Sequence, residues 1–156
     1  FKILSREIRE QGVMFIVNDD LRLALELEAD GVHFGQEDIK NLDISQIPDH
    51  LLVGISTHNP DQVAQAKALG ADYIGVGPIF ETRTKKNVEK SDGLQFLKWV
   101  SNNVEIPYVA IGGIEPVKLA QLRENGLKIA AMISSISKSE SDKELRDLVE
   151  QFCRTR

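Results

Sequence analysis

Short apolar runs alternate along the chain with longer stretches in which apolar residues recur every three or four positions. Most of the runs lack the period of two that marks a half-buried strand, and this is typical of strands buried on both faces of a parallel sheet. They predict six strands: VMFIV (13–17), GVHF (31–34), LLVGI (51–55), YIGVGPIF (73–80), YVAIGG (108–113) and IAAMIS (129–134). The longer stretches predict helices at 1–10, 21–29, 59–70, 93–103, 115–126 and 139–156.

Repeated strand–helix units with short connections predict an α/β fold with a parallel sheet, either open and doubly wound or closed as a (β/α)8 barrel. Polar residues gather where the predicted strands end, and that edge of a parallel sheet is where ligands bind in both architectures. Because every successive strand contributes such residues, a ring of loops fits better than one crevice. The groups are Asn18 and Asp19; Gln36 to Asp38; Ser56 to His58; Thr82 to Lys85; Gly112 and Gly113; and Ser134 and Ser135.

Length and composition narrow the class of protein. The 156 residues, with 42% hydrophobic and 28% charged, predict one globular domain over 1–156. A net charge of -5 and a pI near 5.2 argue against a non-specific nucleic-acid binder. Cys153 is the single cysteine, so no internal disulfide forms and a cytoplasmic location is expected. The sequence has no apolar run long enough to span a membrane, and we expect no membrane partner.

Two acidic residues follow neighbouring predicted strands. Asp19 ends the first strand and Asp38 follows the second in GQED, so both carboxylates would face one cavity. Two carboxylates suit Mg²⁺, which completes its coordination with water and substrate phosphates. The alternative is that both residues only cap the following helices, while Asp20 and Glu37 are expected to be solvated or to cap.

Anion-binding features follow the later strands. The pairs Gly112–Gly113 and Ser134–Ser135 come after the last two strands, where barrels often bind phosphate through backbone N–H groups. Such pairs are also common in ordinary strand-to-helix turns. The segment Thr82–Lys86 adds hydroxyls and cations, with Lys85 as a mobile charge for an anionic oxygen. A solvated surface loop is the simpler interpretation of Arg83 and Lys86.

Six motifs in this order and spacing resemble the thiamine phosphate synthase family: FIVNDD, GVHFGQED, VGISTHN, ADYIGVGPIFETRTKK, IPYVAIGGI and AAMISSI. The resemblance runs through about the first 136 residues. It implies a (β/α)8 barrel and a transferase that couples a hydroxymethylpyrimidine diphosphate to a thiazole phosphate. Thiamine phosphate and pyrophosphate would be the products, and Mg²⁺ the cofactor. The implied mechanism is dissociative, with small-molecule substrates as partners. The sequence leaves the oligomeric state open, a homo-oligomer included.

The resemblance also implies site residues. Asp19 and Asp38 would hold Mg²⁺, and Asn18, Ser56 and Lys85 would contact the pyrimidine diphosphate and act in catalysis. The thiazole phosphate would be held by a second set: Thr82, Arg83, Thr84, Gly113, Ile133 and Ser134. No role is implied for His58, which we interpret as a structural loop residue.

In the family two strand–helix units, the second ending in a basic segment, precede the part matched here. We therefore expect this chain to be N-terminally incomplete, with six of eight barrel strands. Two other functions stay open. One is the related thiazole tautomerase, which isomerises the thiazole precursor. The other is a non-catalytic module that binds a phosphate ligand or regulates.

Overall fold

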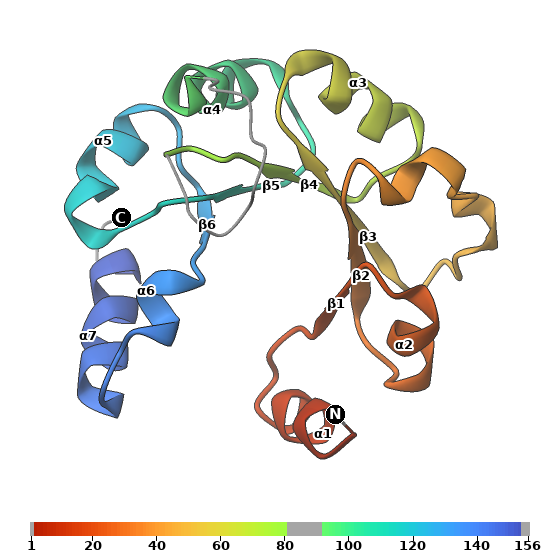
Figure 1. The fold of residues 1–156 in the computed structure, drawn as a ribbon, viewed down its shortest axis with the longest axis horizontal. Coiled ribbons are helices and arrows are strands. Elements are labelled where there is room, and N and C mark those ends of the chain that lie inside the picture. The colour runs from red at the N-terminus through yellow and green to blue at the C-terminus, as the bar shows by residue number, and fades with distance from the viewer. Residues whose placement is uncertain (1, 81–91, 154–156) are drawn as a thin grey trace. The chain divides into compact units, whose positions relative to one another are not determined.

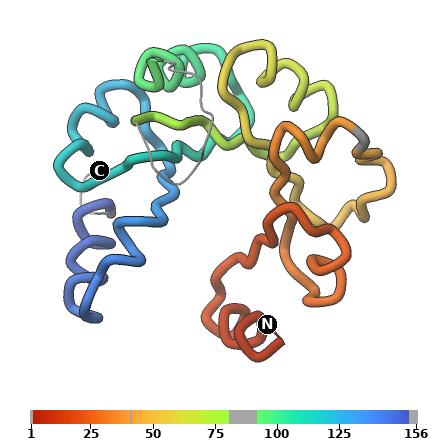
Figure 2. The backbone as a smooth tube through the Cα atoms, viewed as in Figure 1, coloured from red at the N-terminus to blue at the C-terminus, as the bar shows by residue number. Residues whose placement is uncertain are grey.

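The structure is a computed structural model that describes residues 2–80 and 92–153. The chain divides into two compact units, residues 1–75 and 76–156, which Figure 2 colours red to yellow-green and green to blue. Six strands lie in the described residues, and their order along the sheet is the chain order, β1-β2-β3-β4-β5-β6. The predicted alternation of strands and helices is confirmed (Figure 1). Each unit is described by itself below.

The first unit contains the strands that carry most of the predicted site. Strands β1, β2 and β3 pair in parallel, with Asn18 beside His33 and His33 beside Gly54. Helix α2 packs against β1 and β2, and α3 packs against β3 (Figure 1). In chain order the elements are α1 (Lys2–Glu10), β1 (Ile16–Asn18), α2 (Leu21–Glu26), β2 (Gly31–Phe34), the 3-10 helices η1 (Asp38–Asn41) and η2 (Ile44–Gln46), β3 (Leu52–Thr57), α3 (Pro60–Ala68) and β4 (Tyr73–Val76).

The core of the first unit lies on one face of its strands. Val32, Ile55 and Ile74 are fully buried, at 0% exposure. Since side chains alternate between the two faces of a strand, the residues next to them, such as His33, Ser56 and Tyr73, point to the opposite face. These three residues are only half-buried. The strands therefore hold a set of polar side chains on the face away from the apolar core.

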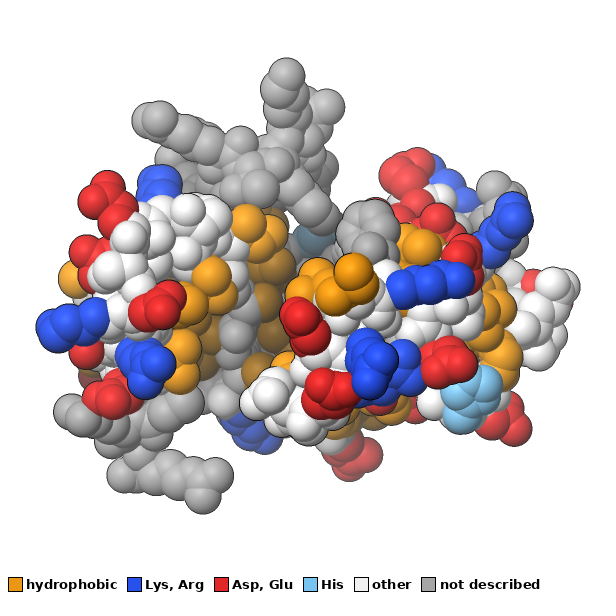
Figure 3. Space-filling model, turned by 90° about the horizontal axis from the view of Figure 1, so that it is seen from below, with side chains coloured by type: hydrophobic (Ala, Val, Ile, Leu, Met, Phe, Trp, Pro, Cys, Tyr) orange, Lys and Arg blue, Asp and Glu red, His pale blue; other side chains and the backbone are white. Residues whose placement is uncertain are grey.

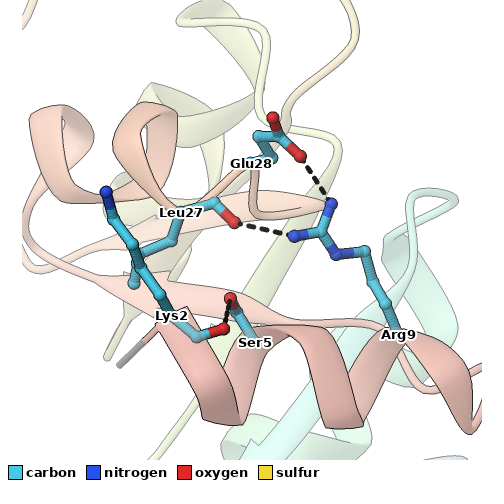
Figure 4. A network of polar contacts seen from close by, with 5 residues as sticks. All are labelled: Lys2, Ser5, Arg9, Leu27 and Glu28. Atoms are coloured by element: carbon cyan, nitrogen blue, oxygen red, sulfur yellow. Dashed lines mark hydrogen bonds and ion pairs between the residues drawn. The ribbon is translucent and has the colours of Figure 1, made fainter.

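The N-terminal helix is tied to the turn after α2. Arg9 donates to the Glu28 carboxylate at 2.8 Å and to the Leu27 carbonyl at 3.3 Å, as Figure 4 shows. The predicted first strand, 13–17, is wrong at both ends, because β1 covers Ile16–Asn18. Val13 and Met14 are apolar but 57% and 69% exposed, so the apolar pattern there does not mark a buried strand.

In the second unit, β5 and β6 pair in parallel. Leu97, Val100 and Leu122 are fully buried at its centre. After Val76, its elements are α4 (Gly93–Asn103), β5 (Tyr108–Ile111), η3 (Pro116–Lys118), α5 (Leu119–Glu124), β6 (Ile129–Ala131), α6 (Ser134–Ser137) and α7 (Asp142–Cys153).

Three predicted strands are longer than the strands in the structure. The run 73–80 forms β4 only as far as Val76, and the proline at position 78 cannot donate a ladder hydrogen bond. The run 108–113 stops before Gly112 and Gly113, which have positive φ. The run 129–134 ends at Ala131, because helix α6 begins at Ser134.

Acidic and basic side chains are interspersed on the face of the molecule drawn in Figure 3. Exposed ion pairs among the described residues include Lys2 with Glu26 and Lys143 with Asp147. Within the described residues, no helix is both long and apolar enough to cross a membrane.

Candidate functional site

The predicted metal ligand Asp19 lies directly after β1 in an unusual backbone conformation. Its φ of 64° is in the left-handed region, which residues other than glycine rarely occupy. Its N–H donates to the His33 carbonyl at 2.8 Å, and its carboxylate accepts from the Asn18 amide at 2.5 Å. Strained backbone of this kind often occurs at functional sites. The structure thus brings Asn18 and Asp19 together beside β2.

Asp20, rather than Asp19, caps the helix that follows. The Asp20 carboxylate accepts from the Leu23 N–H at 2.8 Å, so it is the N-cap of α2. This confirms the expected capping role of Asp20. Asp19 is therefore not the N-cap of α2, and its side chain is exposed.

Asp38, the second predicted metal ligand, is exposed and is the first residue of η1. One carboxylate oxygen, Oδ2, accepts from the Gly35 N–H at 2.9 Å, which fixes the side chain against the end of β2. Asp38 does not cap the helix that follows it, contrary to the alternative interpretation. The N-cap residue of η1 is Glu37, whose side chain makes no capping hydrogen bond.

The donor set fits Mg²⁺ better than a metal that needs a full cage of protein ligands. Among the residues that the structure describes, no group of three or more His, Cys, Asp or Glu side chains gathers in one place. Asp19 and Asp38 follow neighbouring parallel strands. Oδ2 of Asp19 accepts from the side-chain amide of Asn18, and Oδ2 of Asp38 accepts from the Gly35 N–H. Mg²⁺ is commonly held by one or two carboxylates, with water and substrate phosphates completing the octahedron.

Ser56 lies inside β3, one residue before its end, rather than after the strand as the sequence predicted. Its Oγ is 2.9 Å from Nε2 of His33 on β2, and Nδ1 of His33 is 3.0 Å from the Tyr73 hydroxyl on β4. Burial raises the pKa of Tyr73, so the phenol keeps its proton at neutral pH. Three strands thus supply one chain of hydrogen bonds that ends at Ser56.

Two glycines leave room for this chain of side chains. A Cβ on Gly54 would lie 2.4 Å from the Tyr73 hydroxyl and 2.5 Å from Nδ1 of His33. A Cβ on Gly75 would lie 3.3 Å from Cε1 of His33. Glycine is needed at position 54 because any side chain there would displace the contact between Tyr73 and His33.

A loop residue adds a further contact at the same strand. The side-chain amide of Gln36, after β2, donates to the backbone carbonyl of Ser56 at 2.6 Å.

His58 follows β3, and its backbone N–H donates to the Gln62 side chain at 2.7 Å. The interpretation of His58 as a structural residue stays a prediction.

In the second unit, the predicted phosphate loop is the turn at Gly112 and Gly113, whose shape depends on backbone conformation. Gly112 and Gly113 have φ of 101° and 60°, and a Cβ on Gly112 would lie 2.6 Å from the Pro78 Cβ. The segment after β4 pairs with this turn, since the Phe80 N–H donates to the Gly112 carbonyl at 3.1 Å. Both glycines are therefore required by conformation, and Gly112 is also required by close packing.

The other predicted residues of this loop region are exposed. Ile133 is 59% exposed and precedes α6, and Ser134 is the first residue of that helix and is also exposed. Ser135 donates to the Ile114 carbonyl at 2.9 Å and so ties α6 to the turn that contains Gly113. The structure therefore brings the start of α6 and the diglycine turn together.

Lys118 is a cation that the sequence did not single out. Its Nζ donates to the Gly113 carbonyl at 3.2 Å, pairs with Glu115 at 3.1 Å and lies 4.4 Å from the centre of the Phe80 ring. These contacts tie Lys118 to the diglycine turn. The predicted residues Thr82, Arg83, Thr84 and Lys85 lie outside the described residues.

The sequence also missed His33 and Tyr73. Both are polar residues within apolar runs, and that is the local signal the sequence carries for them. The partners of His33 are Ser56 and Tyr73, which lie 23 and 40 positions away. Only the strand register places them together.

The fold and the site define an α/β protein with polar residues at the carboxyl ends of parallel strands. The sequence model for thiamine monophosphate synthase matches residues 2–136, and the chain belongs to this family. The chain is 46% identical over 136 residues to a thiamine-phosphate synthase of Pelotomaculum thermopropionicum, with 86% of this chain and 62% of that protein covered. It is 43% identical to one from Bacillus velezensis, with 86% and 61% covered.

A solved structure has the same fold. The thiamine phosphate pyrophosphorylase from Pyrococcus furiosus superposes with a TM-score of 0.82 at 30% identity, covering 98% of this chain and 72% of that one. This similarity, with the six described strands, confirms the predicted fold class of α/β barrel type. The chain spans about three fifths of the length of the two curated relatives above.

Proposed function

We propose that the protein is a thiamine phosphate synthase, a transferase that joins hydroxymethylpyrimidine diphosphate to thiazole phosphate. Family membership over residues 2–136 carries this proposal. The positions of Asn18 on β1 and Ser56 on β3, the two strands that pair with β2, support it, because these side chains can donate hydrogen bonds to a diphosphate.

In this proposal the first unit binds the diphosphate. Asp19 and Asp38 would hold Mg²⁺, which supplies positive charge to the departing diphosphate. The Asn18 amide and the Ser56 hydroxyl donate hydrogen bonds to the same anionic oxygens. Lys85, from the TRTK segment (Thr82–Lys85), adds a positive charge there. Together these groups stabilise charge on the leaving group as the bond to the pyrimidine methylene breaks, which is a dissociative path.

The thiazole phosphate is assigned to the second unit and the TRTK segment. Gly113, Ile133 and Ser134 offer backbone N–H groups and one hydroxyl, and Thr82, Arg83 and Thr84 would add theirs. Backbone N–H groups that glycine leaves accessible are well suited to a phosphate. The thiazole nitrogen then captures the pyrimidine methylene cation, so no protein nucleophile is required.

The test is the formation of thiamine phosphate from the two substrates, with Mg²⁺ and with a chelator, in the full-length protein. Product that appears only with Mg²⁺ is the expected result. A folded protein that forms no product would contradict the proposal and favour the tautomerase or the binding module. Assaying residues 1–156 in parallel tests whether this chain suffices. The cytoplasmic location, the single domain and the homo-oligomer stay predictions.

A further inference from the structure

The hydrogen-bond chain from Tyr73 through His33 to Ser56 raises a question about proton direction. The Tyr73 hydroxyl is 3.0 Å from Nδ1 of His33, and Ser56 Oγ is 2.9 Å from Nε2. A neutral imidazole has one N–H donor and one acceptor nitrogen. For a neutral His33 two arrangements are therefore open: either Ser56 accepts a hydrogen bond from the ring, or Ser56 donates its proton to the ring.

Tyr73 favours the first arrangement. Among the described residues, its hydroxyl has one hydrogen-bond partner, the His33 ring. Burial keeps the phenol protonated, since it raises the pKa of Tyr73, and a partly buried O–H that donates to nothing is unfavourable. Donation to Nδ1 satisfies this proton. It also places the His33 proton on Nε2, from where it is donated to Ser56 Oγ.

Ser56 then keeps its own proton for another acceptor. Its Oγ accepts from His33, and no other side-chain partner of Ser56 lies among the described residues. The residue is half-buried near the end of β3, on the face that also carries Asn18 and His33 in register. A hydroxyl in this state is a donor suited to an anionic oxygen, and it cannot be deprotonated by His33 through this bond.

We propose that Tyr73 and His33 are positioning residues that hold Ser56 Oγ as a hydrogen-bond donor to an anionic phosphate oxygen of the ligand. This inference rests on the proposed function for the identity of that ligand. The sheet supports the arrangement: Gly54 leaves the space in which Tyr73 and His33 meet, and Gln36 fixes the Ser56 backbone carbonyl at 2.6 Å.

The proton direction can be measured without ligand. In the full-length protein labelled with ¹⁵N-histidine, the two ring-nitrogen shifts of His33 report its tautomer, and the spectrum of His33→Gln assigns them. We expect the Nε2–H tautomer in the wild type and a loss of this preference in Tyr73→Phe. A wild-type His33 that carries its proton on Nδ1 would overturn the proposal, because Ser56 would then be the donor to the ring.

The effect on the ligand is tested with Mg-pyrophosphate as the probe, by titration calorimetry. Tyr73→Phe should weaken binding about 3- to 10-fold, as expected for one neutral hydrogen bond. The same change made in a Ser56→Ala background should add nothing, because Tyr73 acts through Ser56. Tyr108→Phe is the matched control, since that hydroxyl donates to Gly126 at 2.6 Å in the second unit, and it should bind as the wild type does.

Two results would contradict the proposal in this assay. One is a Tyr73→Phe effect of full size in the Ser56→Ala background, which would make Tyr73 act independently of Ser56. The other is wild-type affinity in Ser56→Ala, which would remove Ser56 from the ligand. Failure of the proposed function would give a different set of results. Thiamine phosphate would not form, but the His33 tautomer and its dependence on Tyr73 would still be as expected.

Discussion

In the proposed function, the two units offer groups to an anion in different ways. In the first unit, Asn18 and Ser56 offer side chains from β1 and β3, which both pair with β2, and His33 contacts Ser56. In the second unit, Gly112 and Gly113 form a turn that is proposed to offer its backbone N–H groups. This difference predicts which substitutions impair each region. The first region should be impaired when a side-chain group is removed, and the second when a side chain is added to a glycine.

The largest effect is expected at a metal ligand of the first unit. Asp38→Ala removes one of two carboxylates, and turnover should fall by about 10³-fold, which corresponds to several kcal/mol of lost charge stabilisation. Steady-state assays with varied Mg²⁺ measure this. Asp20→Ala is the control: it removes the N-cap of α2 and should cost about 1 kcal/mol of stability with turnover retained. Undiminished turnover in Asp38→Ala would remove Asp38 from the metal site.

In the second unit, adding one methyl group should cause the largest loss of stability. Gly112→Ala places a Cβ 2.6 Å from Pro78 at a φ of 101°, so we expect unfolding to be easier by about 2–4 kcal/mol. Gly70→Ala is the matched control, because φ there is 86° but nothing lies within 4 Å, and about 1 kcal/mol is expected. Equal losses in urea denaturation would mean that the contact with Pro78 contributes nothing.

The TRTK segment offers a test of which cation serves the anion. Lys85→Ala should lower turnover by about 10²-fold, because a charge near the leaving group is lost. Lys86→Ala should have little effect, since we interpret Lys86 as solvated. Because both lysines lie outside the described residues, the kinetic comparison of the two variants decides which lysine contacts the anion. The reverse order of effects would show that the wrong lysine was chosen.

The smallest effect is expected at an ion pair away from both regions. Arg9 donates to Glu28 and lowers the pKa of that carboxyl, so the pair stabilises the fold at neutral pH. This contribution is lost as the pH falls through the lowered pKa. Glu28→Gln should therefore lower Tm slightly at neutral pH, and this difference should disappear at pH values below the lowered pKa, where Glu28 is protonated in both the folded and the unfolded state. A Tm difference that is independent of pH would contradict this.

The sequence predicted the strands best where an apolar run is bounded by glycine or by charge. The strand at 31–34 has the same bounds in the structure, because GVHF is continuous and buried. Where apolar residues are exposed, as at Val13 and Met14, the apolar pattern predicted strand residues that the structure does not have. The helix predicted at 115–126 is divided into η3 and α5, and it begins at Pro116.

The candidate site was predictable residue by residue but not as an arrangement. Asn18, Asp19 and Asp38 could be singled out because they lie at or just after the ends of β1 and β2, which is a local feature. The bond between His33 and Ser56 depends on the register between two strands, and a single sequence does not contain that information. The same holds for Gly54, whose role is visible only once Tyr73 lies over it.

The most direct test of the comparison is the binding of two anions to two variants. Mg-pyrophosphate and thiazole phosphate are titrated separately into Ser56→Ala and Ser134→Ala of the full-length protein. We expect Ser56→Ala to weaken only Mg-pyrophosphate and Ser134→Ala to weaken only thiazole phosphate, each by about 10-fold. Variants that weaken both anions equally, or that exchange their effects, would contradict the assignment of one anion to each region.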